Sequence, residues 1–336
     1  MTDTATQATL PQLDNTIIRV AVEETAMNLR TLLAAGAGTL GVAAASNRLL
    51  AARTQDLENP LSGAEYVYRW RGMDIVYTEL GDTDNPDIVL FHGIHAAASG
   101  DEFSAIVEHL AETYHVIVPD LPGFGRTDRP PLVYSATLYE EFVQDFLNDI
   151  AVDPLVVASS LTGSYVAAVA AETDCQGLVL ICPTAETSKD KRWLRTLLRT
   201  PLVGTALFNL LVSKPSLKLF FDRDGYYDVD NLAADELEYA WHSAHQPGAR
   251  YAPASFAAGM LDPDIDLATE LAALEIPVTL VWGRDAELIP LRDGRQLADS
   301  ADTGLIVVDY ATLLPHAEHP ETVVDSLEAE LPQAID

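Results

Sequence analysis

The chain has 336 residues, of which 51 are acidic and 20 basic, so its formal net charge is −31 at pH 7. A surface that binds nucleic-acid phosphates needs clustered basic residues, so this balance excludes a nucleic-acid partner. Hydrophobic residues make up 48% of the chain, enough for a large core, which excludes wholesale disorder. The length allows one large domain or two ordinary ones.

The acidic excess is spread along the whole chain, and only 4 of the 20 cations are lysine. Self-repulsion at this net charge destabilises a compact state in dilute buffer and is tolerated where salt screens it. We therefore expect a protein of halophilic character that works in molar salt. The alternative is an acidic enzyme from an ordinary cytoplasm.

The first 60 residues contain an uncharged run rich in alanine and glycine at residues 31–47. This run is shorter than the ~20 apolar residues of a membrane-spanning helix, and it starts too far behind acidic residues for a signal peptide. We expect residues 1–60 to form a helical extension that packs on the body of the protein. The alternative is weak contact with a membrane or a partner through residues 31–47.

Strands and helices alternate after residue 61. The pattern predicts a hairpin of strands at 66–70 and 73–79, followed by strands at 87–91, 115–120, 154–159, 177–182, 277–283 and 304–310. It predicts helices at 102–112, 135–150, 161–172, 291–298 and 321–331. Apolar strands that alternate with helices are typical of an α/β fold, in which a mostly parallel sheet is covered by helices on both faces.

The alternation is interrupted between the sixth and seventh predicted strands. Residues 184–261 contain no buried strand, and their apolar and aromatic side chains follow the helical period. We interpret this segment as a helical lid inserted after the sixth strand. The core of the fold would then consist of residues 61–183 and 262–336.

The sequence offers no cofactor or metal site. Cys175 and Cys182 lie seven residues apart, which places them roughly 20 Å apart on an extended chain, too far for a disulfide. The His, Asp and Cys spacings match no metal-ligand pattern, and no glycine-rich phosphate loop follows the first strands. A reduced cysteine pair is typical of cytoplasm, with peripheral membrane association as the alternative.

Four motifs occur along the chain in a fixed order: HGI at 92–94, DLPGFGRTD at 120–128, ASSLTG at 158–163, and WG at 282–283 with LPHAEHP at 314–320. Together they resemble the lid-bearing branch of the α/β-hydrolase family over residues 65–331. The resemblance implies an α/β-hydrolase fold with an eight-stranded, mostly parallel sheet. It also implies hydrolysis at a serine on a tight strand-to-helix turn.

The serine of such a turn needs small residues two positions before and two after it. Ser160 is flanked in this way by Ala158 and Thr162, whereas the equivalent neighbours of Ser159 are bulky. Ser160 is therefore the residue at the nucleophile position, with β-branched Thr162 in place of the usual glycine. By the same resemblance, the backbone N–H groups of Ile94 and Leu161 would bind the oxyanion.

The other two members of the catalytic triad are missing from their usual places. The resemblance places Ala286 at the position of the acid and Leu313 at the position of the base. Leu313 cannot accept a proton, and Ala286 cannot orient a base. The candidates for relocated partners of Ser160 are His316, Glu287 and His95, and Glu186, His242 and His245 are further possibilities near the cleft.

Two functions fit these motifs. The first is hydrolase-like action of Ser160 on a small apolar ester, lactone or related molecule, with a relocated base. The second is a non-catalytic protein of the same fold that binds a small molecule; Ala286 and Leu313 favour this alternative. A third hypothesis is a scaffold or membrane-associated partner that uses the N-terminal run. The oligomeric state is left open.

Overall fold

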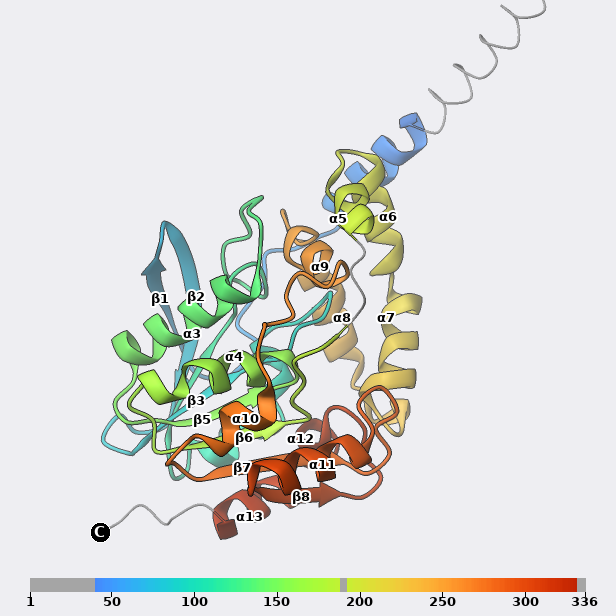
Figure 1. Ribbon diagram of the computed structural model, residues 1–336. Coiled ribbons are helices and arrows are strands. Elements are labelled where there is room, and N and C mark those ends of the chain that lie inside the picture. Colours follow the sequence, from blue (N-terminus) through green and yellow to red (C-terminus); the bar gives the residue numbers. More distant parts are fainter. Residues whose placement is uncertain (1–39, 188–191, 331–336) are drawn as a thin grey trace, which may run out of the picture.

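The computed structural model describes residues 40–187 and 192–330 (Figure 1). Eight strands form one sheet in the order β1-β2-β4-β3-β5-β6-β7-β8. The pairs β1–β2 and β2–β4 are antiparallel, and all other neighbours are parallel. The expected eight-stranded, mostly parallel sheet is thus confirmed. The strands are β1 (Ala64–Trp70), β2 (Met73–Leu80), β3 (Asp87–Phe91), β4 (His115–Pro119), β5 (Leu155–Ser159), β6 (Gly177–Ile181), β7 (Val278–Gly283) and β8 (Gly304–Val308).

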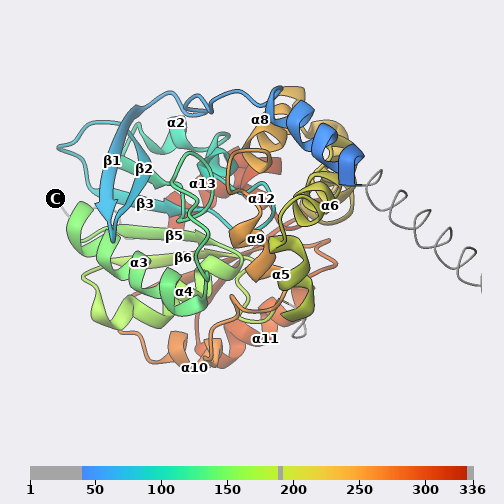
Figure 2. The ribbon, with the colours of Figure 1, turned by 90° about the horizontal axis from the view of Figure 1, so that it is seen from above.

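Helices cover both faces of the sheet (Figure 2). The central strands β4, β5, β6 and β7 are buried along their whole length, as their unbroken apolar sequences predict. One face packs against α3 (Ala136–Ile150), α4 (Leu161–Val169), α10 (Leu267–Ala272) and α11 (Leu291–Ala301). The other face packs against a 3-10 turn (Gly100–Phe103), α2 (Val107–Leu110) and α13 (Pro320–Glu330). The short helix α12 (Pro315–Glu318) precedes α13.

A helical insertion separates β6 from β7. It consists of α5 (Arg192–Arg199), α6 (Val203–Leu211), α7 (Lys214–Phe220), α8 (Ala234–Ala244) and α9 (Tyr251–Phe256), with short helical turns at Phe221–Gly225 and Val229–Asn231. The insertion has its own apolar cluster, which includes Phe208, Leu217 and Trp241. Residues 188–191, at its start, lie outside the described residues.

The chain is helical from residue 40 to residue 51, within the extension expected at residues 1–60. This helix packs on the helical insertion: Asn47 Nδ2 donates to the Leu202 carbonyl oxygen at 3.0 Å, and Leu50 contacts the insertion's apolar cluster. Residues 1–39, and with them most of the uncharged run at 31–47, lie outside the described residues, as do residues 331–336. Among the described helices, none has the length and apolar character needed to span a bilayer.

Two local expectations differ from the structure. The helix expected at 102–112 is a 3-10 turn followed by the four-residue helix α2. Helix α10 was not predicted, although Asp266 caps it by accepting a hydrogen bond from the Thr269 N–H at 2.8 Å. Cys175 and Cys182 are both free and buried, as expected.

Candidate active site

Ser160 occupies the turn between β5 and α4. Its backbone has a conformation that residues other than glycine rarely adopt. Its φ is 54° and its ψ is −129°, and its N–H donates to the Ile181 carbonyl oxygen on β6 at 2.8 Å. Such strain is typical of the nucleophile position in a strand-to-helix turn. Ser159, by contrast, ends β5 and is only 2% exposed. The structure therefore places Ser160, and not its neighbour, at the turn.

Thr162 replaces the glycine that commonly follows such a turn, and its side chain has a specific partner. The Thr162 hydroxyl donates to the carbonyl oxygen of His92 at 2.7 Å, and both residues are fully buried. The bond joins the first turn of α4 to the loop that follows β3. Thr162, which departs from the motif by its β-branched side chain, thus makes one buried hydrogen bond at this position.

The loop after β3 lies close against the serine turn. A Cβ atom added to Gly93 would lie 3.2 Å from Ser159 Oγ and 3.3 Å from Ser160 Cβ, so a side chain there would make its neighbours shift by a few tenths of an ångström. The N–H groups of Ile94 and Leu161 flank the turn, and neither has a hydrogen-bond acceptor among the residues that the structure describes. These are the two groups that the resemblance assigned to an oxyanion.

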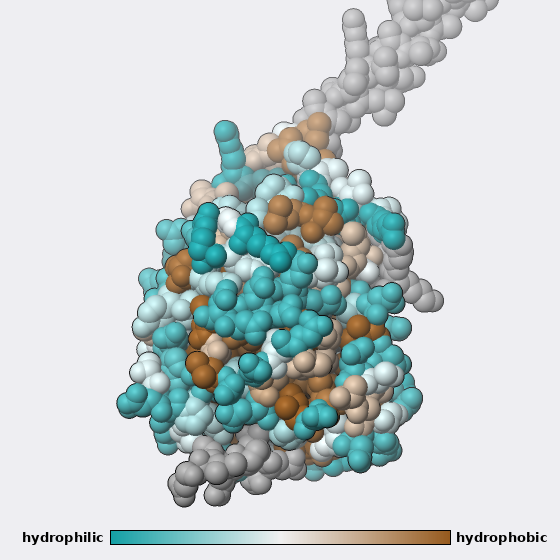
Figure 3. Space-filling model, turned by 60° about the vertical axis from the view of Figure 1, so that its left-hand side comes forward, coloured by the Kyte–Doolittle hydropathy of each residue, from teal (hydrophilic) through white to brown (hydrophobic). Residues whose placement is uncertain are grey.

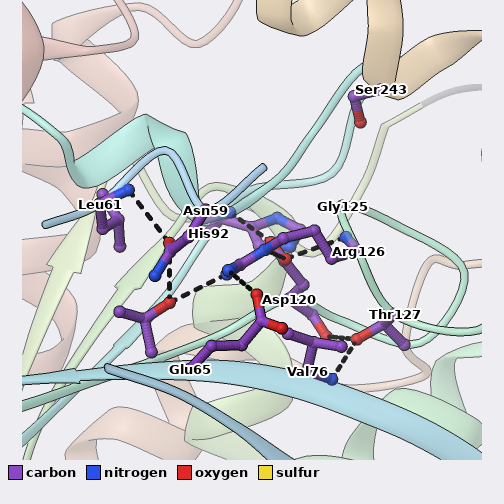
Figure 4. A network of polar contacts seen from close by, with 12 residues as sticks. Asn59, Leu61, Glu65, Val76, His92, Asp120, Gly125, Arg126, Thr127 and Ser243 are labelled. Atoms are coloured by element: carbon purple, nitrogen blue, oxygen red, sulfur yellow. Dashed lines mark hydrogen bonds and ion pairs between the residues drawn. The ribbon is translucent and has the colours of Figure 1, made fainter. Parts of the chain in front are cut away.

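A network of buried polar contacts around Asp120 and His92 stabilises the loop after β3 (Figure 4). Asp120 accepts hydrogen bonds from the Gly100 N–H at 2.7 Å and from Arg126 Nε at 2.9 Å, and both side chains are buried. His92 Nε2 accepts from the Leu121 N–H at 3.0 Å, so the ring proton is on Nδ1, 2.7 Å from the Gly93 carbonyl oxygen. His92 therefore positions the loop and has no free nitrogen for the cleft.

The positions that the resemblance assigns to acid and base meet in one apolar cluster. Ala286 is 5% exposed and packs with Cys182, Trp282 and Leu291, and Leu313 packs against the same cluster. Leu313 also borders the cleft above Ser160. An apolar cluster thus contains the two positions that the resemblance assigns to the carboxylate and the imidazole of a triad.

The cleft has a volume of about 290 Å³ and lies at the carboxyl ends of the strands, beneath the helical insertion. Its walls come from the loops after β3, β5, β6, β7 and β8, and from the insertion. Its lining includes large apolar and charged side chains together with Ser160: Ile94, His95, Glu102, Ser160, Glu186, Phe220, Arg223, Asp224, Phe256, Leu288, Ile289, Leu313 and Leu314. Among the described residues, no group of three or more His, Cys, Asp and Glu side chains could hold a metal ion.

The structure separates the candidates for relocated partners. His95 and Glu186 border the cleft, whereas Glu287 is exposed and does not line it. His316 is fully buried, with Nε2 3.5 Å from Glu102 Oε1, and also lies outside the cleft lining. The histidines of the insertion, His242 and His245, lie beside Trp241 and do not line this cleft either.

His95 borders the cleft but is not arranged as a general base. Its ring stacks on Phe220 at 5.5 Å, and burial lowers the pKa of His95 to about 4, so the ring is neutral at pH 7. Nδ1 accepts the Ala97 N–H at 3.3 Å, which leaves the ring proton on Nε2. In that tautomer Nε2 donates a hydrogen bond and cannot take a proton from a serine.

Glu102 is a site residue that the sequence did not single out. Its Oε2 accepts the Gly93 N–H at 2.9 Å, and its side chain is 5% exposed. Burial alone would raise the pKa of Glu102, but the imidazole of His316 and the hydroxyl of Ser159 favour its ionised form and lower the pKa to about 2. Its pairing with His316 forms only when the distant segment 315–318 packs beside it in the fold, and no local sequence motif indicates it.

Comparisons with known proteins agree with this fold. A model of the Alpha/beta hydrolase family matches residues 88–326. The match to the uncharacterized hydrolase YNR064C of Saccharomyces cerevisiae is 42% identical but spans only 59 residues, 20% of that protein. A Metapseudomonas resinovorans hydrolase of 2-hydroxy-6-oxo-6-(2'-aminophenyl)hexa-2,4-dienoic acid is 23% identical over 77% of this chain and 89% of its own.

The solved structures give the same fold. The 2-hydroxy-6-oxo-6-phenylhexa-2,4-dienoate hydrolase of Rhodococcus superposes with a TM-score of 0.65 at 19% identity. That superposition covers 80% of this chain and 98% of the Rhodococcus chain. At this level of identity the likeness concerns the fold alone.

Proposed function

Because the chain belongs to the alpha/beta hydrolase family, we propose that it binds a small neutral, apolar molecule in the Ser160 cleft and hydrolyses esters only at a residual rate. The observation that carries the proposal is the apolar cluster of Ala286 and Leu313. The cleft, the strained serine and the two backbone donors remain, while the groups that would activate the serine do not.

The residual rate follows from the chemistry of serine. An unassisted hydroxyl is a poor nucleophile at neutral pH and needs a base that a third group holds in place. Loss of the nucleophile or the base costs a factor of about 10⁶ in turnover and leaves roughly 10³–10⁴ over water from the oxyanion donors and binding. Ser160 Oγ has no hydrogen-bond partner among the described residues, which fits a hydroxyl without a base.

The charges around the cleft support a neutral ligand. Three carboxylates border it, those of Glu102, Glu186 and Asp224, against a single arginine. That arginine, Arg223, already pairs with Asp224, its Nε lying 2.9 Å from Oδ2. A carboxylate ligand, such as the dienoic acid named for the Metapseudomonas relative, would face net repulsion here. An uncharged ester or lactone would meet mainly apolar walls.

A second candidate function is Ser160-dependent hydrolysis with His95 as the base. It is favoured by one observation, which is that His95 borders the same cleft. It requires the other tautomer of the ring, with the Ala97 N–H contact broken. The two buried free thiols fit a reducing compartment, and we propose the cytoplasm as the place where either function operates.

The test compares ester hydrolysis with ligand binding in molar KCl. We expect the wild type and Ser160→Ala to hydrolyse p-nitrophenyl butyrate equally slowly, and a fluorophosphonate probe to leave Ser160 unlabelled. Phenyl butyrate should raise the melting temperature and free butyrate should not. Leu313→Trp should abolish that rise, while Val152→Trp, at a 76% exposed position, should leave it intact. Rapid labelling of Ser160, with hydrolysis lost in Ser160→Ala and His95→Ala, would establish the second function instead.

A further inference from the structure

Two segments of this strongly acidic chain carry basic residues and no acidic ones. Residues 191–221 carry six cations and no acidic residue, and all four lysines of the chain lie between positions 189 and 218. Residues 25–55 carry three arginines and, again, no acidic residue. Together the two segments hold nine of the 20 cations of the chain and none of its 51 acidic residues.

The fold brings these two segments together. Asn47, on the helix at residues 40–51, donates to the Leu202 carbonyl oxygen at 3.0 Å, and Asn209 Nδ2 on α6 donates to Asn47 Oδ1 at 3.1 Å. The helix lies beside α6 in both ribbon views, at one end of the molecule (Figures 1 and 2). We call the outer surface of residues 40–53 and 192–219 the insertion face.

The insertion face is also apolar. Nine of the seventeen large apolar side chains exposed on the described part of the chain lie on it. Among them, Leu49, Trp193, Leu210 and Leu211 are 55%, 67%, 67% and 52% exposed. Figure 3 shows apolar side chains where the grey N-terminal trace meets the described chain. Exposed large aliphatic residues combined with basic ones are unusual on a soluble surface and mark an interaction site.

We propose that the insertion face docks on the surface of an anionic lipid bilayer. Leucines and a tryptophan enter the boundary between headgroups and acyl chains, and cations such as Arg48, Arg53 and Lys218, which are exposed, meet the lipid phosphates. The remaining surface is acidic and is repelled by the same lipids, so the charges also orient the molecule. Residues 40–47, the described part of the run for which weak membrane contact was the alternative, lie on this face.

The docked orientation places the Ser160 cleft near the bilayer. Helix α7 carries Leu219, which is 63% exposed, and ends at the next residue, Phe220, which borders the cleft and stacks on His95. An apolar ligand dissolved in the membrane would therefore have a short path from the insertion face to the cleft. The docking itself does not depend on what the cleft binds.

Trp193 supplies the readout. The other three tryptophans of the chain, Trp70, Trp241 and Trp282, are at most 9% exposed, so the Trp193 indole alone can change its environment on docking. We expect the full chain to float with vesicles that contain phosphatidylglycerol and to stay behind with pure phosphatidylcholine at moderate salt. Its fluorescence should shift to the blue and be quenched by brominated lipid, and Trp193→Phe should lose both signals while still floating.

Two sets of variants test the chemistry. Leu210→Ser with Leu211→Ser should weaken flotation about 100-fold, because each leucine loses an apolar side chain that enters the bilayer. The matched control is Val67→Ser with Val152→Ser, two exposed apolar positions outside the insertion face, which should float like the wild type. Arg53→Glu with Lys218→Glu should remove the preference for anionic lipid.

Several results would overturn the proposal. These are failure of the full chain to float with anionic vesicles at any salt, equal flotation of the leucine variant and its control, or equal binding to neutral and anionic vesicles. Conversion of a dimer to a monomer by the leucine variant, without an effect on flotation, would assign the face to a second copy of the chain. Thermal melts of each variant establish that it is folded before flotation is compared.

Discussion

The Nε2 atom of His316 lies 3.5 Å from Oε1 of Glu102, and the two side chains are 0% and 5% exposed. Glu102 also accepts the Gly93 N–H in the β3 loop, so the pair connects α12 to the loop beside the serine turn. A buried carboxylate without a compensating partner is strongly destabilising, because the charge loses its hydration. The pair therefore belongs to the structure of the site: Glu102 borders the cleft, and His316 lies behind it, outside the cleft lining.

Removal of one partner of the Glu102–His316 pair should lower the free energy of unfolding. We expect His316→Leu to lower the free energy of unfolding by about 3–5 kcal/mol, because it leaves the Glu102 carboxylate buried and unpaired. His319→Leu is the matched control, since that ring lies at the surface, with Nε2 2.9 Å from the Tyr310 carbonyl oxygen. Denaturant melts in molar KCl measure both changes. Equal stability of the two variants would show that the buried pair contributes nothing.

The same pair predicts a dependence on acid. The pKa of Glu102 is lowered to about 2 in the folded protein, so its ionised form contributes stability that is present above the unfolded pKa and is lost as the pH falls. We expect the wild type to lose more stability than Glu102→Gln between about pH 5 and pH 2, because only the wild type must protonate this carboxylate. Parallel melting-temperature curves for the two proteins over that range would contradict the assignment.

The sequence predicted the sheet well because its central strands are buried on both faces and read as apolar runs. It placed Ser160 at the turn because the small-residue requirement is local, and the structure shows the matching strained backbone. Glu102 and His316 could not be predicted in the same way. Their contact joins segments more than 200 positions apart, and each residue alone resembles an ordinary surface carboxylate or histidine.

Thr162 shows a second limit of the sequence. The motif marks its side chain only as a departure from glycine. The hydrogen bond to His92 that explains it depends on how α4 meets the β3 loop. The helix α10 is a different case: its Asp266 cap was present in the sequence, but six residues give too little periodicity to identify a helix.

Loss of the Thr162 hydroxyl should be costly although its shape is retained. We expect Thr162→Val to lower the free energy of unfolding by about 1–3 kcal/mol, because the buried His92 carbonyl oxygen loses its donor. Thr196→Val, whose hydroxyl bonds within an exposed helix, should change stability by less than about 0.5 kcal/mol. Denaturant titration of both variants checks the difference, and a neutral Thr162→Val would show that the bond is dispensable.

Salt should control folding because of the net charge of −31. At 1 M ionic strength the Debye length is about 3 Å, so repulsion between separated carboxylates is largely removed. We expect a broad transition of low cooperativity in dilute buffer and a sharp one, at a higher melting temperature, in molar KCl. Calorimetry over a salt series measures this, and melting curves that do not move with salt would contradict the interpretation of the composition.

A histidine and an aspartate at the positions that the resemblance assigns to the base and the acid should create an esterase. In Leu313→His with Ala286→Asp, the new imidazole would border the cleft above Ser160 with a carboxylate behind it, in the volume of the present apolar cluster. General-base assistance contributes about 10²–10⁴ in rate, so p-nitrophenyl butyrate hydrolysis should rise by at least about 100-fold and vanish when Ser160→Ala is added. Leu314→His with Ala286→Asp, one position away in the same cleft lining, is the matched control and should gain little.

Two results would refute this account of the site: no gain in the designed variant, or wild-type turnover above about 1 s⁻¹ that Ser160→Ala abolishes. The second would show that a base already serves Ser160, and His95 would be the first residue to replace.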